Sequence, residues 1–418
     1  MQTNRTLYII SFVILCWLNG CNGLLEDGLE PNDRLTYDQL NEPQAFGQLD
    51  TEGILLPGPN ITSLLYTGAN FYSDLFPYTG VMSDEFEWVE NGNIVIYKEI
   101  YEDRLAPTNS GITSLWTKLH SYLAQAQEVI QRVNDTKWLE SPEHQQIKQQ
   151  SLWYAYFHQG NAYVNLFAYF NANQTDPGTL YLEGKSVSHE QTYDLALNSL
   201  EKAMEYGDTY QKRLTNSIIA RAALLKEDWA VATEAVKEGL KINDEPLIMQ
   251  YAQGSLTNGL GNVAGPFGRE LSVPLSFKNL LTTESSIIRN PTTSITTDNG
   301  SRWVQTLYGQ YDNSVVTDFT ETNLIMAELI IRGFYPGNKT DAIILINEVL
   351  NYYDPSGQSA TSEQELTLKE IELYRRIYLS WRGLRLLDLR RLPSDGVAQL
   401  PFSERDWKWF PVPEIEFI

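Results

Sequence analysis

Cysteine is nearly absent from this chain: its 418 residues include only Cys16 and Cys21. Cys16 lies inside an apolar N-terminal run that is expected to be removed, which leaves one cysteine. A single cysteine cannot form an internal disulfide, and it cannot build a cysteine-based zinc site. The fold is therefore expected to be held together by its hydrophobic core alone.

Basic residues are outnumbered as well. There are 31 Lys and Arg against 53 Asp and Glu, a formal net charge of −22. Such a surface repels nucleic-acid phosphates and anionic lipid, so no nucleic-acid partner is expected. The acidic residues are spread along the whole chain, which is typical of a solvated surface and suits an extracytoplasmic protein that binds neutral solutes.

Motifs for catalysis, metals and cofactors are also scarce. No HExxH, GxSxG or P-loop sequence occurs. The four histidines form no pair at i, i+4, and each is interpreted as structural or exposed; they are His120, His144, His158 and His189. Residues 259–264 match a dinucleotide fingerprint by letter, but no strand–turn–helix context surrounds them, so a loop is expected. We therefore expect no catalytic residue, no metal and no cofactor.

What the N-terminus does contain is typical of a bacterial lipoprotein. Residues 7–18 are apolar except for Ser11, which suits a signal peptide and is too short for a transmembrane helix of about 20 residues. Leu18-Asn19-Gly20-Cys21 resembles a lipobox, which predicts a signal peptide over 1–20 and lipid (palmitate) on Cys21. An ordinary secretory cleavage site is the alternative. Residues 21–50, rich in Gly, Pro, Asn and Asp, are predicted to be a tether with an irregular start.

Helical periodicity dominates the rest of the chain. Long helices are predicted over 115–133, 144–170 and 191–206. Three helix pairs are predicted as well: 215–226 with 228–242, 321–333 with 341–353, and 363–378 with 381–391. The first pair resembles a tetratricopeptide unit because alanines and one tryptophan fall where two antiparallel helices must nest. The expected fold is mainly α, with about four tetratricopeptide-like helix pairs and long irregular loops; a generic helical bundle is the alternative.

Three segments are predicted to be irregular, and they interrupt these helices. They cover residues 50–103, the glycine-rich 254–268, and 272–309, which is rich in Ser, Thr and Asn. Long loops inside a compact domain are usually functional or disordered. The organisation expected after the tether is an N-terminal region over 51–250 with helix pairs and a C-terminal region over 251–418 with loops and helix pairs.

Aromatic residues, at 12% of the chain, suggest a sugar site in two of these irregular segments. Sugar rings have apolar faces and polar edges, so they are bound by flat aromatic side chains with hydrogen-bonding groups beside them. The residues predicted to contact the ligand are Tyr72, Asp84, Trp88, Arg302, Trp303, Tyr308 and Tyr311. For any single aromatic, a place in the core is the alternative. Asp84, Glu85 and Glu87 could also form the acid and base of a glycosidase.

Arginines near the C-terminus form a separate cluster. Arg375, Arg382, Arg385 and Asp388 fall at spacings that allow pairing between side chains. Gly383 would let a neighbouring backbone approach closely. The cluster is predicted to lock helices together, and an anion site is the alternative.

Several segments, in their order along the chain, resemble the SusD/RagB family of outer-membrane nutrient-binding lipoproteins. The most specific piece runs from Tyr374-Arg375-Arg376 through Trp381-Arg382-Gly383-Leu384-Arg385 to Asp388-Leu389-Arg390-Arg391. The others are Leu152–Phe170 followed by Tyr181, residues 193–203, Thr215–Leu240, Thr322–Glu328, and Phe410–Pro413 with Glu414 and Glu416.

The resemblance implies a SusD-like fold and a role in capture rather than catalysis, so the protein is not expected to be an enzyme. It implies a surface-exposed lipoprotein, anchored in the outer membrane by its lipid alone. The protein would hold an oligosaccharide, or another small nutrient, for a TonB-dependent SusC-like transporter. Two other functions remain open: a surface glycoside hydrolase, and a repeat scaffold that binds only protein.

Overall fold

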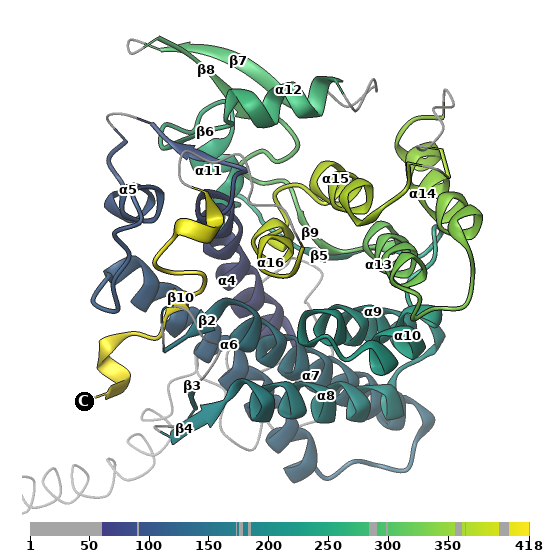
Figure 1. The fold of residues 1–418 in the computed structure, drawn as a ribbon. Helices are drawn as coiled ribbons and strands as arrows, with labels where there is room; N and C mark the ends of the chain where they lie inside the picture. Colours follow the sequence, from purple (N-terminus) through teal and green to yellow (C-terminus); the bar gives the residue numbers. More distant parts are fainter. Residues whose placement is uncertain are drawn as a thin grey trace, which may run out of the picture.

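The computed structural model is mainly helical, as expected (Figure 1). It describes residues 61–89, 92–172, 174, 179–182, 185–283, 291–297, 300–355, 362–363, 365–392 and 401–417. The predicted signal peptide, tether and lipid site at Cys21 lie outside the described residues.

Five consecutive helices form a layered stack along one side of the molecule (Figure 1). They are α6 (Ser110–Asp135), α7 (Pro142–Tyr169), α8 (His189–Tyr206), α9 (Thr209–Lys226) and α10 (Trp229–Lys237). Gly160 allows α7 and α8 to approach closely, because a Cβ there would lie 2.6 Å from Leu200 Cγ. The predicted pair over 215–242 is confirmed as α9 and α10. Glu227, in the left-handed conformation, ends α9, and the Asp228 side chain caps α10.

The later helix pairs are confirmed too. Helix α13 (Phe319–Arg332) packs against α14 (Lys339–Tyr353), and α15 (Leu368–Tyr378) is followed by α16 (Leu384–Arg391). Gly383 begins α16 with a φ of +78°, a conformation that favours glycine. A Cβ at Gly383 would lie 3.0 Å from the Tyr169 hydroxyl, so the close neighbour at this glycine is a side chain and not the backbone that was predicted.

The segment 50–103 is the clearest departure from the prediction. The structure places helix α4 (Ile61–Met82) and the short α5 (Val95–Tyr101) there. Helix α4 contains Pro77 and is buried among α6, α7, α11 and α16. From Gly68 onward nearly every residue of α4 is buried, so this part of the helix has no broad polar face and carries no amphipathic pattern to reveal it.

The predicted loops 254–268 and 272–309 also contain regular elements. Residues 259–264 form a short helix, α11 (Gly259–Ala264), and α12 (Leu275–Thr283) follows. The antiparallel strand pairs are β1 (Glu87–Trp88) with β6 (Leu271–Ser272), β3 (Thr179–Leu182) with β4 (Lys185–Ser188), β5 (Leu247–Met249) with β9 (Ser314–Thr317), and β7 (Thr292–Thr297) with β8 (Gly300–Gln305). Hairpin β7–β8 and α12 lie at the end of the molecule away from α7 and α8 (Figure 1).

One strand pair is parallel and joins distant parts of the chain. Strand β10 (Phe410–Pro411) pairs with β2 (Phe170–Asn171) at the end of α7. Short 3-10 helices flank β10 at Phe402–Glu404 and Glu414–Phe417. Phe410 is fully buried, and the Trp116 indole N–H donates to Glu416 Oε1 at 2.9 Å. The residues near 410 therefore complete the core around α6 and α7.

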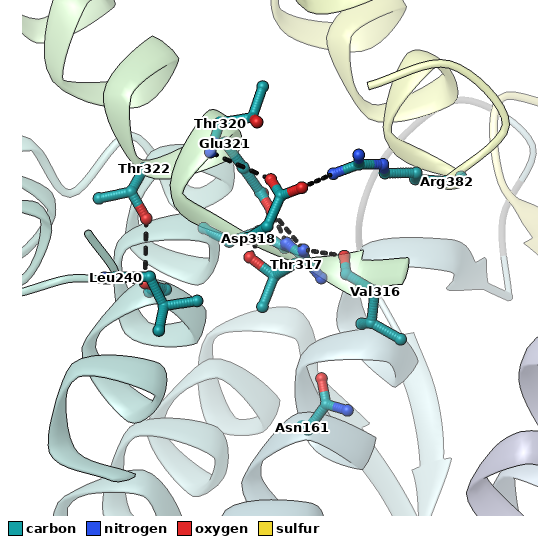
Figure 2. A network of polar contacts seen from close by, with 12 residues as sticks. Asn161, Leu240, Val316, Thr317, Asp318, Thr320, Glu321, Thr322 and Arg382 are labelled. Atoms are coloured by element: carbon teal, nitrogen blue, oxygen red, sulfur yellow. Dashed lines mark hydrogen bonds and ion pairs between the residues drawn. The ribbon is translucent and has the colours of Figure 1, made fainter. Parts of the chain in front are cut away.

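Buried ion pairs tie the early helices to the late ones (Figure 2). Arg221 on α9 donates from Nε to Glu321 Oε1 at 2.7 Å and from Nη2 to the Val316 carbonyl at 2.7 Å. Asp318, which caps α13, pairs with Arg382 at 2.9 Å. Because each charge faces an opposite charge, these groups can remain ionised in the interior.

The predicted arginine cluster has the same role. Arg375 on α15 pairs with Asp388 on α16 at 2.9 Å, and Arg391 also contacts Asp388 at 2.6 Å. These arginines lower the pKa of the Asp388 carboxyl despite its burial, which alone would raise it. The guanidinium groups face carboxylates of the protein itself, so the locking interpretation is supported over an anion site.

Candidate functional site

The structure brings Trp88 and Trp303 into one cluster of strands, although 215 residues separate them (303 − 88). Trp88 on β1 lies opposite Leu271 of β6. Val273, directly after β6, contacts β8: its backbone N–H donates to the Trp303 carbonyl at 2.8 Å. We call β1, β6, β7 and β8 the strand cluster. Both indoles are partly buried against the core beneath it.

Each tryptophan carries a lysine ammonium over its ring. Lys98 Nζ, from α5, lies 5.0 Å from the centre of the Trp88 ring, and Lys278 Nζ, from α12, lies 4.5 Å from that of Trp303. A cation over an indole face contributes roughly 0.5–1 kcal/mol at an exposed site. A ligand that stacks on the same face would have to displace the flexible lysine, which costs little.

Two further side chains belong to the strand cluster or lie near it in the sequence: Arg302 on β8, and Phe267 shortly before β6. The Arg302 guanidinium is half-buried and donates to the Gly268 carbonyl. Burial lowers its pKa, and nearby Glu270 partly offsets this. Phe267 precedes Gly268 in a tight turn closed by the Gly268 N to Gly265 O hydrogen bond of 2.9 Å, and it is 94% exposed. Sequence reasoning missed Phe267, although an aromatic between proline and glycine in a loop was a usable signal.

The predicted ligand contact of Tyr72 is wrong. It was expected in an irregular segment, but it lies on α4 and is only 2% exposed. Its hydroxyl accepts hydrogen bonds from Asn161 Nδ2 at 3.0 Å and Asn165 Nδ2 at 2.9 Å. It therefore belongs to the core between α4 and α7 and offers no surface to a ligand.

Tyr308 and Tyr311 follow β8 by three and six residues, and they have opposite environments. Tyr308 is 7% exposed, and its backbone is fixed by Gln305, whose amide donates to the Tyr308 carbonyl at 2.8 Å. Its expected ligand contact is therefore a second correction. Tyr311 is 41% exposed in a turn where Gly309 N donates to Asp312 Oδ2 at 2.7 Å. Tyr311 remains accessible, and its role stays a prediction.

Asp84 is a third correction. It is 1% exposed and pairs with Arg376 at 2.7 Å and Arg385 at 2.8 Å. Its neighbour Glu85 is equally buried and accepts the Trp381 backbone N–H at 2.7 Å. Burial raises the pKa of Glu85 to about 8. Two carboxyl groups enclosed in this way cannot reach a glycosidic bond outside the molecule, which removes the structural basis for pairing them as a glycosidase acid and base.

The histidines show no common site. His158 is buried, and its Nδ1 contacts the Tyr122 hydroxyl, while burial lowers its pKa to about 3. Burial and the nearby Arg390 lower the pKa of His189 to about 4. Over the described ranges, no three His, Cys, Asp or Glu side chains are grouped as metal ligands would be. None of the helices in the described part combines the length and apolar character required to span a bilayer.

Comparison with known proteins identifies the fold. No family model and no curated protein matches the chain. Among solved structures, a SusD superfamily protein from Bacteroides vulgatus matches with 15% identity and a TM-score of 0.67, over 85% of this chain and 96% of that one. A laminarin-binding SusD-like protein matches with 15% identity, a TM-score of 0.62, and 84% and 96% coverage. Surface glycan-binding protein A from Bacteroides thetaiotaomicron matches with 14% identity, a TM-score of 0.62, and 85% and 96% coverage. The predicted SusD-like fold is confirmed.

Proposed function

We propose that this chain of SusD-like fold is a surface lipoprotein that captures an oligosaccharide without altering it and passes it to a TonB-dependent SusC-like transporter. The observation that carries the proposal is the extent of the likeness: the matched laminarin-binding protein and surface glycan-binding protein are covered over 96% of their lengths. The fold supports binding, and this chain's own residues supply the contacts for it.

The strand cluster supplies the chemistry for a sugar ligand. Trp88, Trp303 and the exposed Phe267 offer apolar surfaces, and Arg302, next to Trp303 in the sequence of β8, offers hydrogen-bond donors. Flat aromatic side chains match the apolar faces of sugar rings, and a few polar groups set the orientation. The buried state of Asp84 and Glu85 favours capture over hydrolysis.

The location is proposed from the N-terminal sequence. The apolar run over 7–18 and the motif ending at Cys21 support export and acylation, and two or more acyl chains give stable membrane attachment. A net charge of −22 suits a surface that handles neutral solutes. The transporter partner follows from the resemblance to the SusD/RagB family.

The test is affinity electrophoresis with a panel of soluble glycans, combined with product analysis. We expect one glycan to retard the protein without being cleaved. Trp303→Ala or Trp88→Ala should weaken binding about tenfold, as is usual for an aromatic contact at the centre of a site. Trp229→Ala is the matched control, because Trp229 is also half-buried beneath a cation (Arg332, 5.1 Å) but lies on α10.

Three outcomes would contradict the proposal. If Trp88→Ala or Trp303→Ala unfolds the protein, that tryptophan belongs to the core and the site is wrong. Release of sugar that depends on a carboxylate would instead support the hydrolase. Copurification of a barrel transporter, with no glycan retarding the protein, would support either the scaffold that binds only protein or a nutrient that is not a sugar.

A further inference from the structure

A cleft of about 470 Å³ lies on the helical side of the molecule, apart from the strand cluster. Its walls are the beginning of α4, the middle of α7, the beginning of α9, and β5 with the residues that follow it. None of Trp88, Phe267, Arg302 and Trp303 lines it. The volume falls within the roughly 300–1,000 Å³ that is usual for small-molecule sites.

The lining of this cleft is uncharged. Charged residues make up 20% of the chain, yet no Asp, Glu, Lys or Arg is among the lining residues. The one lining histidine, His158, is neutral near pH 7, because burial lowers its pKa to about 3. A phosphate or a carboxylate would therefore find no cationic side chain in the lining.

Aromatic side chains are concentrated in the lining. They are Tyr66, Trp153, Tyr154, Tyr210 and Tyr251. Trp153 is 3% exposed at the base, and the Tyr154 ring meets it edge-on at 4.8 Å. Tyr66 is 36% exposed at the opening. The Tyr210 hydroxyl donates to the Glu245 carbonyl at 3.2 Å, which fixes that ring. The cleft is therefore lined by aromatic surfaces that are held in place before any ligand binds.

Amide side chains from three segments accompany these rings. Gln211 Oε1 accepts the Asp208 N–H at 2.9 Å, which anchors the side chain of Gln211. Asn313 Oδ1 accepts the Tyr251 N–H at 3.4 Å, and Gln250 is exposed. Amides both donate and accept hydrogen bonds, which is what the hydroxyl groups of a neutral sugar require.

We propose that this cleft is a second carbohydrate site, which takes a short neutral oligosaccharide independently of the strand cluster. Rigid aromatic faces, neutral amides and the exclusion of charge together fit a sugar better than a peptide or an anion. The choice of ligand class rests on the proposed function, but the site does not depend on the strand cluster. One bound chain could occupy either site alone.

The experiment uses two tryptophans as separate reporters. Indole N–H signals of the ¹⁵N-labelled protein are recorded during titration with maltotriose, cellotriose and laminaritriose. Trp153→Phe and Trp303→Phe identify the signals of the cleft and of the strand cluster. We expect at least one trisaccharide to shift the Trp153 signal in a saturable way. Tyr66→Ala should weaken this binding about threefold to tenfold, with the Trp303 response unchanged.

Gln250→Ala is a second variant, chosen because its exposed side chain can be removed without affecting folding; it should weaken the same response about threefold. Tyr352→Ala is the matched control, since Tyr352 is 55% exposed on α14 and does not line the cleft. A Trp303 response without a Trp153 response would overturn the second site and leave the proposed function intact. A Trp153 response alone would support the cleft and refute the strand cluster as the binding site. A cleft that responds to trialanine but to none of the sugars, or to no probe, would overturn the inference.

Discussion

Replacement of Asp84 by asparagine tests the structural role of this carboxylate most directly. Asp84 is 1% exposed and offsets the charges of Arg376 and Arg385, at 2.7 and 2.8 Å. Asparagine keeps the size of the side chain and removes its charge. Arg385 keeps its ion pair with Glu372 at 2.6 Å, so Arg376 loses a larger share of its compensating negative charge than Arg385 does. Breaking a buried pair in this way costs about 3–5 kcal/mol, because a charge is left buried without a partner.

The assay is equilibrium unfolding in urea together with thermal unfolding. For a chain of this length each kcal/mol corresponds to about 1–1.5 °C, so Asp84→Asn should lower Tm by roughly 4–7 °C. Asp194→Asn, an exposed aspartate on α8, is the matched control and should change stability by less than about 0.5 kcal/mol. If Asp84→Asn left stability unchanged but abolished glycan binding or cleavage, Asp84 would act on the ligand and the structural argument would be refuted.

Three further predictions concern stability and location. Burial raises the pKa of Glu85 to about 8, so the contribution of this carboxyl group to stability is complete below pH 4.5 and is lost as the pH rises to about 8. Relative to the native chain, Glu85→Gln should therefore become more stable as the pH rises through this window, by at most about 5 kcal/mol. A difference in stability between variant and native chain that is the same at pH 5 and pH 8 would contradict this. Gly259→Ala should lower the free energy of unfolding, measured in urea, by roughly 1–3 kcal/mol, because the added Cβ would lie 1.8 Å from the Ser73 carbonyl oxygen. An unchanged midpoint of the urea transition would show that α11 can move away from α4. Cys21→Ala should move the protein from the membrane fraction to the soluble fraction, and continued attachment would disprove the acyl anchor.

The sequence predicted those parts of the fold that depend on neighbouring residues. The pair α9 and α10 has its apolar spacing, its left-handed Glu227 and its capping Asp228 within one short stretch. Helix α4 was missed for the opposite reason. Gly68, Pro77 and Gly80 normally interrupt helices, and the burial of nearly every residue from Gly68 onward leaves no broad polar face to set the period.

The candidate site was only partly predictable, because its geometry depends on distant contacts. Asp84 was given a ligand role from its aromatic neighbours, but the partner that fixes its role, Arg385, lies 301 residues later. Trp88 and Trp303 were both named, yet nothing in the sequence places β1 and β8 in one cluster. The residues of the uncharged cleft come from five separate segments, so no local pattern could reveal it.

The parallel pairing of β10 with β2 sets a condition on when the chain can finish folding. The bonds that close the end of α7 and the base of α6 are supplied by residues 410–416. During synthesis, the early helices keep part of their apolar surface uncovered until residues 410–416 are available. The core around α6 and α7 is therefore completed only by contacts that span more than 200 residues of the sequence, which makes this strand pairing a late step in folding.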